Sequence, residues 1–199
     1  NQPVGCTATI IYQMYQEKGV IIDKKTAGIL LAAIISDTLM FRSPTCTQMD
    51  RAAAEALAKI AEVDIEELAK KMFEAGSDFK KKTTEELFYQ DFKTFHTDEF
   101  DFGVAQLSAM SDVQLGMAKK KLQPYLEIAL GEQKLDAVFV MLTDILDENS
   151  EVIYAGAQAG SLLKECFGEP DESGSFYLKG VVSRKKQMIP TLMAGLQQA

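Results

Sequence analysis

Histidine is nearly missing from this sequence, which contains one such residue, His96, among 199. Imidazole is the most common metal ligand in proteins and a frequent general base. A catalytic site built on several histidines therefore cannot be completed within this chain. A single histidine among aromatic neighbours is more often structural, so we expect a structural role for His96, with a place lining a binding site as the alternative.

Cysteine is also scarce, with three residues, Cys6, Cys46 and Cys166, far apart in the sequence. An odd number at such spacing is not a disulfide framework and suits a reducing cytoplasm. The sequence opens at Asn1 without an initiator methionine and without a charged-then-apolar signal segment. We therefore expect a cytoplasmic protein and interpret this sequence as a piece of a longer chain.

Positively charged residues are fewer than negatively charged ones. The sequence has 21 Lys and Arg residues and 29 Asp and Glu residues, which give a formal net charge of −8. This balance argues against nucleic acid or an anionic membrane as the main partner, so any anion site must be local. No apolar run approaches the roughly 18 residues of a membrane-spanning helix. With 47% hydrophobic and 25% charged residues, the sequence predicts a globular protein with neither nucleic acid nor a membrane among its partners.

Helical patterns fill the first part of the chain, and each has a recognisable end signal. One apolar stripe closes at Gly19, and residues 24–35 form a second helix that is apolar almost all round. Thr47 caps a third, alanine-rich helix, and a fourth helix ends at Gly76.

The composition changes abruptly at residues 76–82, where a Gly-Ser pair precedes three consecutive lysines, and we place a domain boundary there. Beyond it, strand and helix patterns alternate. Strands are predicted at 102–110, 137–142, 152–155 and 176–178, and helices at 83–90, 113–130, 156–166 and 188–196. This order predicts an α/β fold with a mixed sheet and helices packed on it.

The first candidate site residue is Asp37, within Ala-Ile-Ile-Ser-Asp-Thr-Leu-Met-Phe-Arg-Ser at 33–43. The apolar run that precedes it predicts buried backbone, and Ser36 and Thr38 add two hydroxyl groups at the same point. Aspartate is almost never buried without a partner or a metal. We therefore expect Asp37 to be a buried carboxylate that needs a partner.

The second candidate site is Gly-Val-Val-Ser-Arg-Lys-Lys-Gln at 180–187, which we expect at a strand-to-helix junction. The guanidinium of Arg184 and the ammonium of Lys185, beside the N–H groups at a helix start, would form a phosphate clamp with Ser183. Positive charge at a helix N-terminus opposes the helix dipole, and a bound anion would offset this cost. The alternative is a set of solvated cations.

Three segments together resemble one known family. They are Pro-Val-Gly-Cys-Thr-Ala-Thr at 3–9, Ile-Ile-Ser-Asp-Thr-Leu-Met-Phe-Arg-Ser-Pro-Thr at 34–45, and the segment at 180–187. In order and separation they are similar to family II inorganic pyrophosphatases, the manganese- or cobalt-dependent members of the DHH phosphoesterase superfamily. The likeness extends over essentially the whole chain.

The resemblance implies a domain for each part of the chain. Residues 1–75 correspond to the helical C-terminal part of the DHH catalytic domain, residues 76–82 to a linker, and residues 83–199 to a smaller α/β domain that binds the substrate. The Asp-His-His motif of the superfamily, with the ligands before it, would lie upstream of Pro3. We therefore expect this chain to be inactive without the N-terminal part of the same enzyme.

The resemblance also implies roles for individual residues. Asp37 corresponds to one ligand of a two-metal cluster of Mn²⁺ or Co²⁺, with Mg²⁺ accompanying the substrate. Lys93, Ser183, Arg184 and Lys185 correspond to residues that bind pyrophosphate. The implied reaction is hydrolysis of pyrophosphate to two phosphates, with Asp37, Arg184 and Lys185 as the catalytic residues contributed by this chain.

Further partners follow from the same resemblance. It implies a homodimer, and the opening of the chain is also similar to members that carry an inserted pair of regulatory, nucleotide-binding CBS domains.

Two alternatives to this function remain open. One is another DHH phosphoesterase that cuts short nucleotides, although the glycine- and histidine-rich motif of those enzymes is absent here. The other is a module that binds phosphate without chemistry.

Overall fold

The computed structural model describes residues 3–76 and 79–197 and divides into two compact units, residues 1–75 and 76–199. Ser77 and Asp78 of the predicted linker lie outside the described residues, as does the opening at Asn1.

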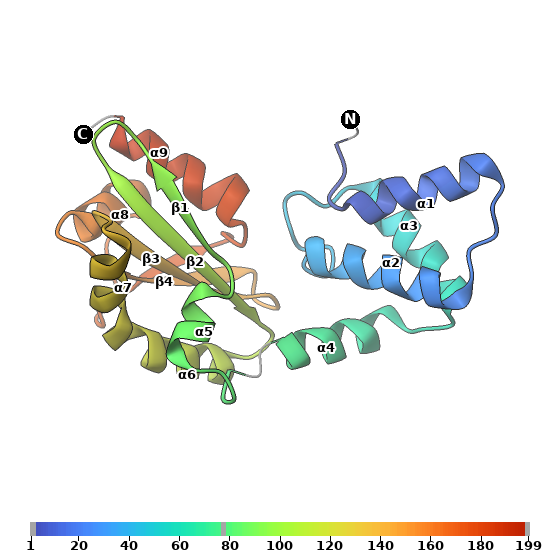
Figure 1. The fold of residues 1–199 in the computed structure, drawn as a ribbon, viewed down its shortest axis with the longest axis horizontal. Coiled ribbons are helices and arrows are strands. Elements are labelled where there is room, and N and C mark those ends of the chain that lie inside the picture. The colour runs from blue at the N-terminus through green and yellow to red at the C-terminus, as the bar shows by residue number, and fades with distance from the viewer. Residues whose placement is uncertain (1–2, 77–78, 198–199) are drawn as a thin grey trace. The chain divides into compact units, whose positions relative to one another are not determined.

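The first unit is helical and contains α1 (Thr7–Lys18), α2 (Lys24–Asp37), α3 (Gln48–Ala61) and α4 (Ile65–Gly76) (Figure 1). Its core is made largely of alanine and branched aliphatic side chains. Its fully buried members include Ala27, Leu31, Ile34, Ile35, Ala54 and Leu57. Small residues let the helices approach closely, which is the packing expected from the sequence.

The predicted end signals of these helices are confirmed. Gly19 ends α1 in the left-handed region, with φ of 63°. Thr47 and Asp50 form a reciprocal capping box at the start of α3, in which each side chain accepts the other residue's amide N–H. These are local signals, so they can be read directly from the sequence.

The second unit is built on one five-stranded sheet in the order β1-β2-β3-β4-β5. The strands are β1 (Phe92–His96), β2 (Asp101–Ala109), β3 (Ala137–Asp144), β4 (Asn149–Ala155) and β5 (Phe176–Lys179). Only β2 and β3 run parallel, and the other neighbours are antiparallel. The predicted α/β fold with a mixed sheet is therefore confirmed, with β1 as an additional edge strand.

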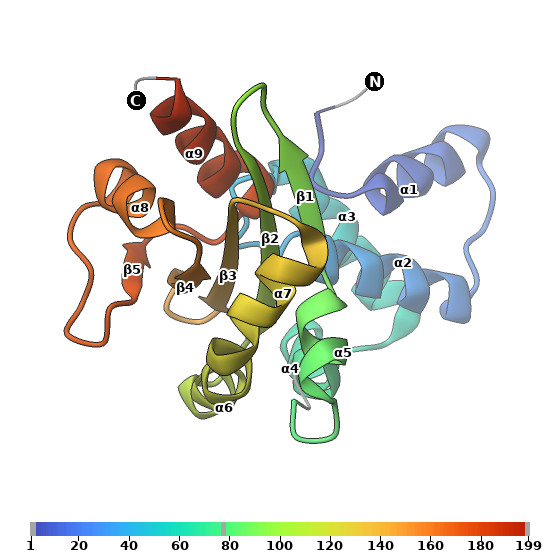
Figure 2. The same cartoon turned by 60° about the vertical axis from the view of Figure 1, so that its left-hand side comes forward.

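Helices cover both faces of this sheet (Figure 2). One face packs against α5 (Thr84–Tyr89), α6 (Asp112–Leu122) and α7 (Leu126–Gln133), and the other against α8 (Ala159–Phe167) and α9 (Ile189–Leu196). Alternate residues of β2, β3 and β4 enter the two cores. In β3, for example, Val138 and Val140 belong to the first core, and Phe139 and Met141 to the second. This strand is thus apolar over the predicted run of residues 137–142.

Two predicted boundaries are wrong. The helix expected over 113–130 is interrupted by a 3-10 turn at Gln123–Tyr125, because Pro124 has no N–H to continue the α-helical pattern. The expected strand-to-helix junction before Arg184 also differs. After β5 the chain turns at Gly180, continues without a strand, and forms a π-helical turn at Arg184–Met188 that leads into α9.

Gly103 in β2 marks a close approach across the first strand pair. A Cβ atom at this position would lie 2.3 Å from Cζ of the Phe92 ring, at the start of β1. The aromatic ring therefore occupies the space that a side chain at position 103 would need. This contact fixes the beginning of β1 on its neighbour.

No helix within residues 3–76 and 79–197 has the length and apolar character needed to cross a membrane.

Candidate functional site

The end of α2 carries Asp37, the first residue predicted for the site. Asp37 is the last residue of the helix, and its side chain is exposed. Burial and a hydrogen bond to Asp37 raise the pKa of the neighbouring Cys6 thiol to about 12, so this thiol stays protonated. The expectation of a buried carboxylate is wrong, because the helix leaves the core after Ile35 and Asp37 reaches the surface.

The two hydroxyl groups beside Asp37 do not converge with it. Ser36 is exposed, whereas Thr38 is fully buried. The Thr38 hydroxyl donates to the carbonyl of Ile34 at 2.6 Å and accepts the amide N–H of Phe41 at 3.2 Å. Thr38 therefore closes the helix and takes a structural role.

A left-handed turn follows directly after α2. Leu39, Met40 and Phe41 have φ values of 48°, 52° and 67°, a region that costs about 1–2 kcal/mol for each residue other than glycine. Arg51 holds the turn, because its Nη2 donates to the carbonyl of Phe41 at 2.8 Å and its guanidinium lies 5.0 Å from the centre of the Phe41 ring. Strain maintained by surrounding contacts is frequent at functional sites.

The buried carboxylate of this unit is Asp50, at the start of α3. It is fully buried and accepts hydrogen bonds of 2.6–3.3 Å from five donors. The donors are the amides of Gly5, Cys6 and Thr47 and the hydroxyls of Thr9 and Thr47. Burial acts to raise the pKa of Asp50, but these hydrogen bonds outweigh it and hold the pKa below its usual value.

Gly5 permits this arrangement by bringing the opening loop against α3. A Cβ atom at Gly5 would lie 2.9 Å from the Thr38 side chain and 3.0 Å from a carboxylate oxygen of Asp50. The position is therefore too tight for a side chain. The motif at 3–9 and the motif at 34–45 therefore come together beside Asp50.

Asp37 fits a divalent metal by donor type but not by ligand number. A carboxylate oxygen is a ligand that suits Mn²⁺. Within residues 3–76 and 79–197, however, Asp37 belongs to no group of three or more His, Cys, Asp or Glu side chains that could hold one ion. A metal centre at Asp37 needs ligands from outside the described residues.

Arg184, the first predicted phosphate ligand of the second unit, is buried and already hydrogen-bonded. Its Nη1 donates to the carbonyls of Asp91 at 2.6 Å and Val104 at 3.1 Å, and its Nη2 donates to the Asp91 carboxylate at 2.7 Å. The side chain of Arg184 is 8% exposed and that of Asp91 is 47% exposed. Arg184 thus ties the π-helical turn to the first two strands of the sheet.

Gln187 holds the turn that precedes Arg184. Its Oε1 accepts the amide N–H groups of Val182 and Ser183, both at 2.9 Å, and its Nε2 donates to the carbonyl of Gly180 at 2.7 Å. The Ser183 hydroxyl accepts the amide N–H of the residue three positions later at 3.2 Å. This turn is therefore held by side chains of its own motif.

Three predicted cations lie at one corner of this unit, which we call the cationic corner and define as Lys93, Arg184 and Lys185. Lys93 is exposed in β1, and its partner across the strand pair is Val104, whose carbonyl accepts a bond from Arg184. Lys185 follows Arg184 and is exposed. The backbone of Lys93 therefore lies in the strand next to the residue that binds Arg184.

His96, at the end of β1, faces Asp101 at the start of β2. The distance from His96 Nδ1 to the Asp101 carboxylate is 3.0 Å, and both side chains are largely exposed. This contact joins the two strands across their connection and favours a structural role for His96.

Sequence reasoning missed three residues that hold these sites, namely Asp50, Asp91 and Gln187. The capping pattern at Thr47 predicted a helix start but gave no sign that five donors would surround Asp50. Asp91 has no local signal at all, because its partner Arg184 lies 93 residues away.

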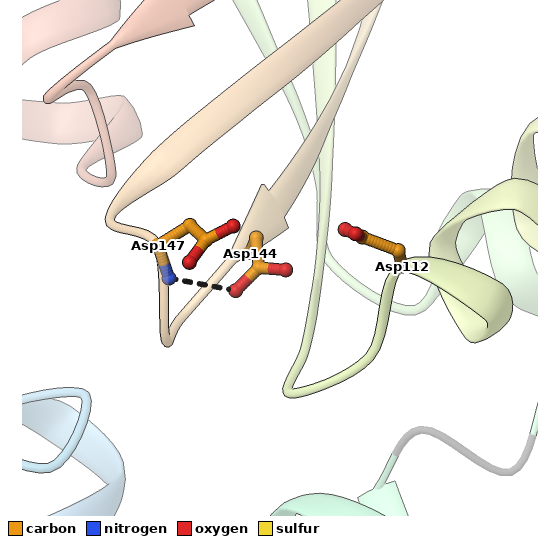
Figure 3. A group of neighbouring side chains, drawn as sticks. All are labelled: Asp112, Asp144 and Asp147. Atoms are coloured by element: carbon orange, nitrogen blue, oxygen red, sulfur yellow. Dashed lines mark hydrogen bonds between the residues drawn. The ribbon is translucent and has the colours of Figure 1, made fainter.

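A second group of carboxylates lies where β3 ends (Figure 3). Oxygens of Asp112, Asp144 and Asp147 lie within 4.8 Å of one another. Asp144 accepts the amide N–H of Asp147 at 3.0 Å. A hydrogen bond to the Asp144 carboxylate, with its negative charge, raises the pKa of Asp112. Two of its members, Asp144 and Asp147, are brought together by the turn after β3.

Comparison with known proteins gives a family match over most of the chain. The DHHA2 domain family matches residues 70–194. A Clostridium acetobutylicum protein assigned as a manganese-dependent inorganic pyrophosphatase is 41% identical over 197 residues, which cover 99% of this chain and 63% of that protein. The manganese-dependent inorganic pyrophosphatase of Bacillus subtilis is 43% identical over 191 residues, which cover 96% of this chain and 62% of that protein.

A solved structure agrees with these relatives. The crystal structure of a Methanococcus jannaschii protein assigned to the family II inorganic pyrophosphatases matches 98% of this chain and 66% of its own, with a TM-score of 0.85 and 33% identity. The resemblance read from the three motifs is confirmed. The chain spans slightly less than two thirds of the length of the relatives it matches.

Proposed function

The chain belongs to the DHHA2 domain family, and on this basis we propose that it forms part of a metal-dependent inorganic pyrophosphatase, a hydrolase that converts pyrophosphate to two phosphates. The names of its curated relatives support this reaction and support manganese as the metal. Cobalt at the same centre and Mg²⁺ with the substrate are further expectations.

The observation that carries the proposal is the cationic corner. Lys93 and the Arg184–Lys185 pair come from two segments far apart in the sequence, and Arg184 donates to the carbonyl of Val104, the strand partner of Lys93. In a chain with net charge −8, a local cluster of cations is the feature that would attract a phosphate anion. Lys93 and Lys185 are exposed and would contact the phosphate groups, while Ser183 shapes the turn beside them.

The roles of the two units follow. Residues 1–75 would be the C-terminal part of the DHH catalytic domain, residues 76–82 the linker and residues 83–199 the substrate-binding domain. Asp37 would supply one carboxylate ligand to the metal centre, with its backbone fixed by the strained turn that follows. The metals would activate a water molecule and hold the phosphate that it attacks.

The remaining ligands would come from an N-terminal part of the same enzyme, which is the partner this chain requires. We expect a homodimer in the complete protein. A cytoplasmic location fits three cysteines that are all free thiols.

The direct test is pyrophosphate hydrolysis by the full-length protein that contains this chain. With Mn²⁺ we expect the full-length protein to release phosphate much faster than the uncatalysed reaction. With the 199-residue chain alone we expect negligible release, because Asp37 alone cannot build a two-metal centre. Turnover by the pure 199-residue chain would contradict the division of ligands proposed for the site.

Two other functions predict different results. A phosphate-binding module without chemistry would bind pyrophosphate in calorimetric titration with no dependence on manganese and would release no phosphate. Another DHH phosphoesterase would prefer a short nucleotide over pyrophosphate. A substrate comparison with the full-length protein separates the three.

A further inference from the structure

Arg184 is the cation of the cationic corner that the structure holds most firmly, and one of its partners carries a negative charge. We infer that Asp91 competes with phosphate for the Arg184 guanidinium and thereby sets how tightly the site holds substrate and product. This inference rests on the proposed function, because it requires phosphate groups to bind beside Arg184.

The contacts of Arg184 show where competition would occur. Its Nη1 and Nη2 are both engaged, by two carbonyl oxygens and by the Asp91 carboxylate. A guanidinium normally grips phosphate through two parallel N–H groups. A phosphate that approaches Arg184 must therefore bind next to the Asp91 carboxylate or displace it from Nη2.

Arg184 is held by two kinds of group, main-chain carbonyls and one partly exposed side chain. The carbonyls of Asp91 and Val104 are main-chain groups of the sheet edge and do not depend on any side chain. The Asp91 carboxylate is 47% exposed, so it can turn toward water when an anion arrives. The carbonyl bonds position Arg184, whereas the carboxylate offsets part of the positive charge that Arg184 presents to an anion.

The same arrangement acts on the product. After hydrolysis, the Asp91 carboxylate would recover its bond to Nη2 as phosphate leaves. A site with three cations and no such anion would hold phosphate too tightly for fast release. Asp91 is therefore assigned as a residue that tunes affinity through Arg184, rather than as a catalytic residue.

The test replaces the charge and keeps the shape. In the full-length protein that contains this chain, Asp91→Asn retains an oxygen that can accept from Nη2 but removes the negative charge. Titration with inorganic phosphate by calorimetry should give a dissociation constant about three- to tenfold lower than that of the wild-type protein. The KM for pyrophosphate should fall by a similar factor.

Two variants control for general effects. Asp101→Asn removes the same charge from the same strand pair, where the carboxylate faces His96, and should change phosphate affinity by less than about twofold. Asp91→Glu keeps the charge and should behave like the wild-type protein. The salt concentration is held constant, because exposed charges are screened by ions.

Each outcome decides the inference. Unchanged or weaker phosphate binding by Asp91→Asn overturns it, as does an equal gain in Asp101→Asn or no phosphate binding by either protein. If the wild-type protein does not hydrolyse pyrophosphate, the proposed function fails, yet a gain in phosphate affinity confined to Asp91→Asn would still support competition at Arg184.

Discussion

The two units of this molecule stabilise a buried charge in different ways. Among the described residues of the first unit, Asp50 is buried and accepts bonds from five neutral donors. In the second unit, Arg184 is buried against two carbonyls and one carboxylate that is half exposed. Asp50 is fully satisfied and closed to ligands, whereas Arg184 shares its charge with a group that can move.

Each buried charge stands close to an exposed one. Asp37 lies at the surface near the Asp50 network, and Lys185 lies at the surface beside Arg184. The comparison teaches that the two members of each pair differ in what they contact. The buried member holds neighbouring backbone through its hydrogen bonds, and the exposed member is accessible to solvent.

The largest expected effect comes from removing the buried carboxylate of Asp50. Asp50→Ala leaves five donors without an acceptor and should lower the free energy of unfolding by about 3–5 kcal/mol, because buried polar groups lose their partners. Urea unfolding of the full-length protein, followed by circular dichroism, measures the change.

Asp37→Ala is the matched control for Asp50→Ala. Its side chain is exposed, so the free energy of unfolding should change by less than about 0.5 kcal/mol, while manganese binding weakens. Equal destabilisation by the two substitutions would show that the distinction between a buried and an exposed aspartate is wrong.

The second prediction concerns Lys185, the exposed cation beside Arg184. Lys185→Ala should lower kcat/KM for pyrophosphate by about 10- to 100-fold, because it removes an exposed cation that we propose contacts phosphate and does not disturb the fold. Steady-state kinetics of the full-length protein measure it. Lys186→Ala, which removes the adjacent exposed cation, should have an effect of less than about threefold. Comparable losses would mean that the whole run of cations acts only through its total charge.

The smallest expected effect concerns Asp112 and Asp144, two carboxylates that lie close together near the surface. Asp144→Asn should return the raised pKa of Asp112 toward its usual value, because the carboxylate that stabilises the protonated form is gone. Carboxyl chemical shifts followed by NMR against pH measure this change. A pKa of Asp112 that stays raised in the variant would show that Asp144 is not the cause of the shift.

The same substitution has a consequence for stability. A raised pKa in the folded state stabilises the fold at low pH, and this contribution is lost as the pH rises through the folded-state pKa. At pH 7 the repulsion is present, so Asp144→Asn should stabilise the protein by at most about 1 kcal/mol, since the carboxylates are solvated. At pH 3 the gain should vanish.

Local features of the fold could be predicted from the sequence. Gly19 and Thr47 end or begin helices through contacts within a few residues, so their patterns are sufficient. The apolar run of β3 identifies a strand buried on both faces. Pro124 shows the limit, because amphipathic periodicity continued across it and concealed a break in the helix.

The site could be predicted only in part, and the reason is distance along the chain. Motifs located Asp37, Arg184 and Lys185, since those residues stand in distinctive local sequences. Burial could not be read from the motif: the apolar run ends at Ile35, two residues before Asp37, and the helix reaches the surface there. The partner of Arg184 is Asp91, and only the register of the first two strands brings them together.

The contact between Gly103 and Phe92 has a consequence for how these two positions change among related proteins. Since the ring occupies the space of the missing side chain, a larger residue at position 103 can be accepted only with a smaller one at position 92. The two positions should therefore covary. Asp91 precedes Phe92 directly, so pairs that break this rule should also misplace the carboxylate that faces Arg184.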